Sequence, residues 1–76
     1  MIPIQIEVTE DDRNFRVIQS EVAELTPANI RQAMKNAELK GDEYIYQVCA
    51  PVEGCELPQP VYDFFNGFRI YFEEKE

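Results

Sequence analysis

The stretch IPIQIEVT, residues 2–9, alternates apolar and polar side chains, and its pattern decides how the remaining segments can pack. The apolar side chains recur with a period of two, which predicts a β-strand with one buried face. They are Ile2, Ile4, Ile6 and Val8. A strand with one apolar face needs other elements to cover that face, so the neighbouring segments are expected to pack around these side chains.

The segment that follows predicts a β-hairpin. The sequence TEDDRN, residues 9–14, holds turn-forming aspartates and an asparagine. Residues 14–22 return to β-branched and aromatic side chains, which predicts a second strand. Val17 and Ile18 are adjacent and both apolar, so the alternation is interrupted there, and a β-bulge is one explanation.

A helix is predicted over residues 27–40. Thr26 is a typical N-cap, and Pro27 suits the first helical position. Lys40 fits the last turn, and Gly41 is typical of the position just after a helix. The apolar side chains recur with helical spacing, which predicts one stripe that packs on a sheet. They are Ile30, Ala33, Met34 and Ala37.

A third strand is predicted over residues 43–50, where β-branched and aromatic side chains are dense. Two inward-facing sets fit this strand, either Tyr44, Tyr46 and Val48 or Ile45 and Cys49. Residues 51–60 contain three prolines and one glycine, which indicates an irregular loop.

Residues 60–66 have two interpretations. Asn66-Gly67 between apolar runs is a typical hairpin signal, with Val61 and Phe65 among the residues on its buried face. Alternatively, Pro60 begins a short helical turn whose buried side is Val61, Phe64 and Phe65, and Gly67 ends it. Both interpretations predict a last strand over residues 68–73, with Phe68, Ile70 and Phe72 directed inward.

The composition predicts a small acidic protein. The chain has 76 residues, 45% of them hydrophobic, and a net charge of −8, which opposes binding to nucleic acid. We find neither a signal-peptide pattern nor an apolar run long enough for a membrane span, so a single cytoplasmic domain is expected. The bases are unevenly placed, since Arg31, Lys35 and Lys40 fall in one short segment.

Several kinds of site chemistry lack the residues they need. The chain has no histidine, and Cys49 and Cys55 are too few ligands for a structural zinc site. The cluster Glu10, Asp11, Asp12 lacks the alternating ligands of a calcium loop and is better explained as a hairpin turn. We therefore expect no enzymatic activity, no cofactor and no metal, and we expect the two cysteines to be unpaired.

The order of these elements resembles that of a known fold. A hairpin, a capped helix, a strand and a long connection into a last apolar strand resemble the ubiquitin-like β-grasp. The resemblance implies an α+β domain in which one helix packs on a mixed four-stranded sheet. It also implies that the last strand lies beside the first and is preceded by a short helical turn, so it favours the helical interpretation of residues 60–66.

More narrowly, the chain is similar to the ubiquitin-like domains called multiubiquitin, which occur in bacterial ubiquitination-like operons. The shared features are Thr26 at the helix start, Tyr44 with Tyr46, Val61 with Asp63, then Gly67 and Phe72. The resemblance implies a modifier or recognition domain. Its partners would be activating- or conjugating-enzyme-like proteins, together with a peptidase that trims the C-terminus. The chain departs from conjugated modifiers because it ends in Glu-Glu-Lys-Glu and not in Gly-Gly.

The resemblance also implies where partners would bind. If the chain is conjugated, the activated group would be the terminal carboxylate on Glu76. The outer face of the sheet would present Gln5, Arg69, Tyr71 and Tyr46 as partner-binding residues, because tyrosine and arginine are enriched at protein interfaces.

The composition alone supports an alternative function. A small acidic inhibitor or accessory protein, of the type that phages and mobile elements encode, would bind a basic protein surface through its carboxylates. Binding of this kind weakens as salt rises. In either case the core is expected to include Ile4, Ile6, Ile30, Met34, Ile70 and Phe72. The sequence does not indicate an oligomeric state.

Overall fold

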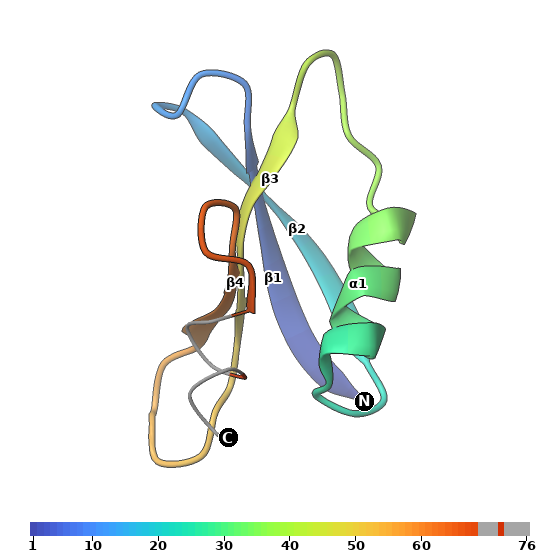
Figure 1. Cartoon of the computed structure of the whole chain (residues 1–76), viewed down its shortest axis with the longest axis vertical. Coiled ribbons are helices and arrows are strands. Elements are labelled where there is room, and N and C mark those ends of the chain that lie inside the picture. Colours follow the sequence, from blue (N-terminus) through green and yellow to red (C-terminus); the bar gives the residue numbers. More distant parts are fainter. Residues whose placement is uncertain (69–71, 73–76) are drawn as a thin grey trace.

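The computed structural model describes residues 1–68 and 72, which form a four-stranded sheet with one helix on one face (Figure 1). The elements in chain order are β1 (Ile2–Thr9), β2 (Phe15–Val22), α1 (Pro27–Asn36), β3 (Tyr44–Ala50) and β4 (Gln59–Asp63). The strands lie in the order β2-β1-β3-β4. In the described part of the chain, no helix is long and apolar enough to cross a membrane.

The predicted N-terminal hairpin is confirmed. β1 pairs with β2 in an unbroken antiparallel register that runs from Ile2 opposite Val22 to Thr9 opposite Phe15. The β-bulge considered near Val17 is therefore wrong. The alternation is interrupted for a different reason: Val17 faces away from the helix and is 46% exposed, while Ile18 packs against the core.

The sheet is antiparallel throughout, so the predicted mixed sheet is wrong. β3 is hydrogen-bonded to β1 and runs antiparallel to it. After α1 the chain runs in the same direction as β2. β3 therefore occupies the place beside β1 that a last strand parallel to β1 would need. The implied arrangement with the last strand next to the first is therefore not the one observed.

Residues 59–63 are a strand and residues 64–66 are a turn, so the helical turn favoured for residues 60–66 is wrong. β4 pairs with β3 through residues 59–63, and its backbone groups hydrogen-bond to the N–H and C=O groups on the edge of β3 that β1 does not use. The hairpin interpretation is closer, because the chain turns after Asp63 and Gly67 bridges back to it. The Gly67 N–H donates to the Asp63 carbonyl at 2.6 Å, and Gly67 has φ of 64°, which glycine adopts without strain.

The last strand predicted over residues 68–73 lies mostly outside the described residues. Phe68 and Phe72 are described, and neither belongs to a strand. The Phe72 N–H donates to the Phe68 carbonyl at 2.9 Å. Ile70, predicted to be in the core, lies outside the described residues.

The helix begins where predicted but ends earlier. Thr26 caps it, since the Thr26 hydroxyl accepts a hydrogen bond from the Asn29 N–H at 3.2 Å. The helix ends at Asn36, and Ala37 is already extended. Contacts from elsewhere hold the following segment: Arg16 donates to the Glu38 carbonyl at 3.2 Å, and the Lys40 N–H donates to Glu43 at 2.9 Å. These contacts compete with the last predicted turn.

The core lies between α1 and the sheet. Its fully or nearly buried apolar residues are Ile4, Ile6, Val8, Val22, Ile30, Ala33, Val48, Ala50 and Val61. The predicted core positions Ile4, Ile6 and Ile30 are confirmed. Met34 and Phe72 are partly buried against this cluster.

Neither inward-facing set predicted for the third strand is correct. The register of β3 against β1 shifts between Glu7 and Val8, so that Val8 lies opposite Ile45 while Glu7 lies opposite Gln47. Tyr46 is the extra residue of this β-bulge. Ile45 and Val48 consequently both pack against the core, although only two residues separate them and strict alternation would place them on opposite faces.

Candidate functional site

The sheet has one face that α1 does not cover, and we call it the outer face (Figure 1). Cross-strand partners share a face, so the register assigns its residues. Thr9 lies opposite Phe15 on β2 and Tyr44 on β3. In the next row Glu7 lies between Val17 and Gln47. The outer face is therefore partly aromatic and partly polar.

Five aromatic side chains form a continuous chain of ring contacts, which we call the aromatic cluster. It consists of Phe15, Tyr44, Tyr46, Phe64 and Phe65. Ring centroids lie 5.1 Å apart for Phe15 with Tyr46 and 5.1 Å apart for Tyr44 with Phe64. Such edge-on and tilted contacts are attractive beyond simple area burial.

The cluster remains accessible at its phenylalanines. Phe65 is 69% exposed, Phe64 is 49% exposed and Phe15 is 46% exposed. Val17, also 46% exposed, extends the apolar surface along β2. Large apolar side chains that are exposed singly are ordinary, whereas a contiguous exposed set is typical of interaction surfaces and makes this face the candidate site.

Local structure fixes the position of the two adjacent phenylalanines. The Asp63 carboxylate accepts hydrogen bonds from the Phe65 N–H at 2.7 Å and the Asn66 N–H at 3.1 Å. The Phe64 N–H donates to the Tyr46 carbonyl at 2.8 Å. The turn after β4 is thereby tied to the bulge in β3, and the rings that it carries are preorganised.

Carboxylates lie at the end of the cluster next to the β1–β2 turn. Thr9 is buried, and its hydroxyl donates to the Asn14 carbonyl at 2.7 Å and accepts from the Asp12 N–H at 3.0 Å. The Asp11 carboxylate accepts from the N–H groups of Arg13 and Asn14, each at 2.9 Å. The acidic cluster is thus the hairpin turn that the sequence predicted.

Asp11 is expected to make stability depend on pH. Hydrogen bonds from the Asn14 and Arg13 N–H groups lower the pKa of Asp11 from 3.8 to about 2. A depressed carboxyl pKa contributes stability above pH 3.8, and that contribution is lost as pH falls toward 2. The free energy of unfolding, measured by urea titration across this window, should fall less steeply in Asp11→Asn than in the wild type.

Glu43 provides the comparison for this experiment. Hydrogen bonds from the Arg16 side chain and the Lys40 N–H lower the pKa of Glu43 to about 2, so its contribution is lost in an overlapping window. Asp11→Asn combined with Glu43→Gln should therefore show the shallowest pH dependence. Identical slopes for Asp11→Asn and the wild type would contradict the assigned role of Asp11.

Two other titratable side chains of the outer face are held in their neutral forms. Tyr44 donates its hydroxyl to Asp12, and this bond together with burial raises the pKa of Tyr44 to about 12. Burial, with Glu7 nearby, raises the pKa of the Cys49 thiol to about 11. Cys49 is therefore a weak nucleophile at neutral pH. Neither cysteine is in a disulfide, and Cys55 is exposed.

Cations are absent from the outward positions of the four strands as far as the structure describes them. Arg16 points to the helix side, where its guanidinium pairs with Glu43 at 2.6 Å. Arg31, on α1, lies over the Phe68 ring, with 4.8 Å from the guanidinium carbon to the ring centroid. Arg13 is in the β1–β2 turn. Charge on the outer face is therefore carried by carboxylates.

The predicted partner-binding residues are only partly placed. Gln5 lies on the outer face, opposite Gln19 and Cys49, and Tyr46 belongs to the aromatic cluster. Arg69 and Tyr71 lie outside the described residues, as does Glu76, the predicted conjugation residue.

Sequence reasoning missed the phenylalanines of the cluster. Phe64 and Phe65 were assigned to a buried side, yet both are exposed. Both lie in the turn that follows β4, and the Asn66-Gly67 pair was the available signal that the chain turns there. Phe15 has the same parity as Val17, which places both on the outer face.

Comparison with protein-family models, curated proteins and solved structures gives no match. Within residues 1–68 and 72, no group of three or more histidine, cysteine, aspartate or glutamate side chains could hold a metal ion. The geometry and charge of the outer face are therefore the features that bear on function.

Proposed function

We propose that this chain is a protein-binding domain that captures a basic protein surface on its outer face. The single observation that carries the proposal is the exposed aromatic cluster, which lies beside carboxylates on a face whose strand positions present no cation in the described residues. Aromatic faces attract guanidinium and ammonium groups, and carboxylates pair with them.

The charge of the whole chain supports the same function. A net charge of −8 attracts a basic partner over a distance and accelerates the encounter. The aromatic cluster supplies what charge alone does not, namely apolar area held in a fixed geometry. Because the turn that carries Phe64 and Phe65 is tied to β3, little conformational freedom is lost on binding.

A ubiquitin-like modifier or recognition domain of a bacterial ubiquitination-like pathway is the second proposal. Thr26 caps the helix, as the resemblance implies, and Tyr44 and Tyr46 lie together on a partly accessible face. The strand order speaks against this second proposal, because β3 lies beside β1, where the resemblance places the last strand. The test is to incubate the chain with ATP and an activating enzyme encoded beside it. Mass spectrometry would then detect a C-terminal adenylate or thioester if the chain is a modifier.

The protein-binding function is tested with simple cationic probes. Labelled peptides of about eight arginines, lysines or glutamates are titrated by fluorescence anisotropy at low and high salt. We expect the arginine peptide to bind most tightly, because guanidinium stacks on aromatic rings better than ammonium does. The glutamate peptide should not bind, and the affinity for arginine should fall steeply with salt.

Variants separate the aromatic contribution from general charge attraction. Phe64→Ala with Phe65→Ala should weaken arginine-peptide binding about tenfold, which corresponds to about 1.4 kcal/mol. Leu57→Ala is the matched control, since Leu57 is 73% exposed in the loop before β4 and should leave binding unchanged. Equal affinity of the double variant and the wild type would overturn the assignment of the outer face.

A further inference from the structure

One edge of the sheet has no strand beside it in residues 1–68 and 72. β2 is at the end of the strand order and is hydrogen-bonded only to β1 among the described elements. It has eight residues and contains no proline that would block pairing. The backbone groups of such an edge can pair with a strand from another chain.

The side chains of β2 differ on its two faces. On the outer face Phe15 and Val17 are exposed and continue the apolar surface of the aromatic cluster. On the helix side Arg16, Ile18 and Ser20 are only half-covered. The side chains on both faces of an added strand could therefore contact accessible side chains of β2.

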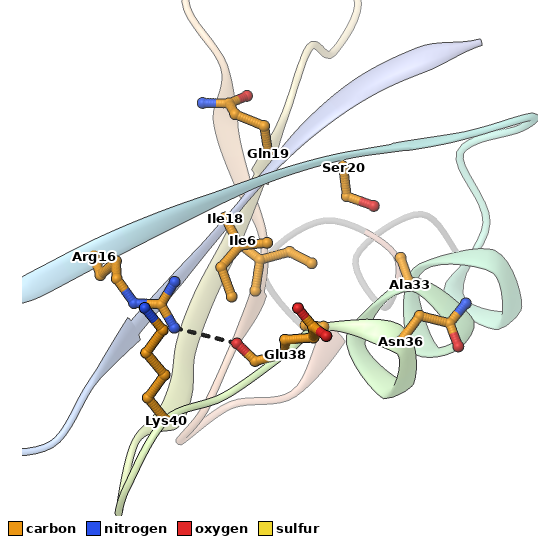
Figure 2. A pocket seen from close by; sticks show the side chains of 10 residues that line it. Ile6, Arg16, Ile18, Gln19, Ser20, Ala33, Asn36, Glu38 and Lys40 are labelled. Carbon is orange, nitrogen blue, oxygen red and sulfur yellow. Dashed lines mark hydrogen bonds between the residues drawn. The ribbon is translucent and has the colours of Figure 1, made fainter.

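A cavity of about 430 Å³ lies on the helix side of this edge, as Figure 2 shows. Ile6 and Ile18 contribute apolar surface from the sheet, and Ala33 and Ala37 contribute it from the helix side. The end of α1 at Asn36 and the segment that follows it, with Ala37, Glu38 and Lys40, form the side of the cavity that faces β2. Its rim includes Arg16, which is already paired with Glu43.

We propose that the basic partner supplies an extended segment that pairs with the free edge of β2 as a fifth strand. Alternate side chains of a strand point to opposite faces. One set, apolar, enters the cavity, and the other set, lysine or arginine, lies on the outer face near Phe15 and the Glu21 carboxylate. This inference rests on the proposed function, of which it specifies the binding mode.

Charge favours a basic segment over a second copy of this chain. Two copies, each with a net charge of −8, repel one another, whereas a cationic strand is attracted. The outward positions of β2 present the Glu21 carboxylate and carry no cation that would repel such a strand.

The probe is a synthetic eight-residue peptide that alternates valine and arginine. The control peptide has the same composition, but its valines and arginines are arranged in pairs (Val-Val-Arg-Arg repeated). An extended control peptide therefore has arginine on both faces and no face that is only cationic. We expect the alternating peptide to bind about tenfold more tightly. Hydrogen exchange of the ¹⁵N-labelled protein should slow about tenfold at the β2 amides that face the open edge, and not at β4.

Filling the cavity provides an independent test. Ser20 lines the cavity and lies opposite Ile4 on the helix side of the sheet. Ser20→Leu should weaken binding of the alternating peptide about tenfold, whereas Ser20→Ala, which leaves the space open, should not. Thermal unfolding of both variants establishes that they are folded before binding is compared.

The outcomes separate this inference from the proposed function. Suppose that arginine peptides bind, that their affinity depends on Phe64 and Phe65, and that the β2 amides gain no protection. Strand addition to β2 is then wrong, while the proposed binding of a basic partner on the outer face is retained. Protection at β4 would also overturn it. A concentration-dependent dimer that protects β2 without peptide would show that a second copy takes the edge, which contradicts a basic occupant.

Discussion

The Ile30→Ala variant is expected to lose about 2–5 kcal/mol of its free energy of unfolding. Ile30 is fully buried, and it is one of only two buried residues on α1, with Ala33 as the other. A helix of ten residues is not stable by itself in water, so its docking depends on this side chain. A chain of this length has roughly 4–11 kcal/mol in total, so the loss is a large part of it.

Urea unfolding followed by circular dichroism measures this effect. Ile30→Val is the matched control, because it removes one methylene and should cost about 0.5–1.5 kcal/mol. Met34→Ala, at a half-buried position on the same helix, should cost less than Ile30→Ala. An Ile30→Ala protein with the midpoint of the wild type would contradict the position of the core.

A Gln5→Cys variant is expected to form a disulfide with Cys49 under oxidising conditions. Gln5 and Cys49 are direct cross-strand partners on the outer face, and cross-strand Cα atoms in antiparallel pairs lie about 4.5–5.5 Å apart. That separation is within the range of disulfides. If another strand lay between β1 and β3, the two Cα atoms would be about 10 Å apart, beyond the reach of a disulfide. The crosslink therefore tests the sheet order that separates this fold from a β-grasp.

The disulfide should also stabilise the chain by about 2–4 kcal/mol, because it closes a long loop in the unfolded state. The measurement is thiol titration and thermal unfolding with and without reductant, in a Cys55→Ser background that prevents other pairings. Pro3→Cys in the same background is the control, since Pro3 has no partner on β3. Free thiols in the oxidised Gln5→Cys protein would show that β1 and β3 are not neighbours in this register.

Elements governed by local signals could be predicted from the sequence. β1 follows from the period of two in residues 2–9, and the helix start follows from Thr26 and Pro27. The helix end could not be predicted in this way. Arg16, distant in sequence from the end of α1, donates to the Glu38 carbonyl and to Glu43 and so holds the segment after the helix. Propensity is a weak guide where tertiary contacts compete for the same backbone groups.

The candidate site was less predictable than the fold. Gln5 and Tyr46 were expected on the outer face; the register places Gln5 there, and its ring contact with Phe15 places Tyr46 there. Phe64 and Phe65 were assigned to a core because large apolar residues are usually buried. Their exposure depends on the turn after Asp63, and that turn depends on β4 pairing with β3. Pairing between segments distant in sequence leaves no periodic signal in either segment.

The sequence by itself determined the hairpin, the capped start of the helix, the burial of Ile4, Ile6 and Ile30, and the acidic charge. Each of these depends on neighbours along the chain or on composition. Only the tertiary structure decided that β3 lies between β1 and β4, that Tyr46 is bulged, and that five aromatic rings from three segments meet on one face. Strand order is set by which backbone edges remain free after the hairpin and helix have packed, and that is a property of the assembled sheet.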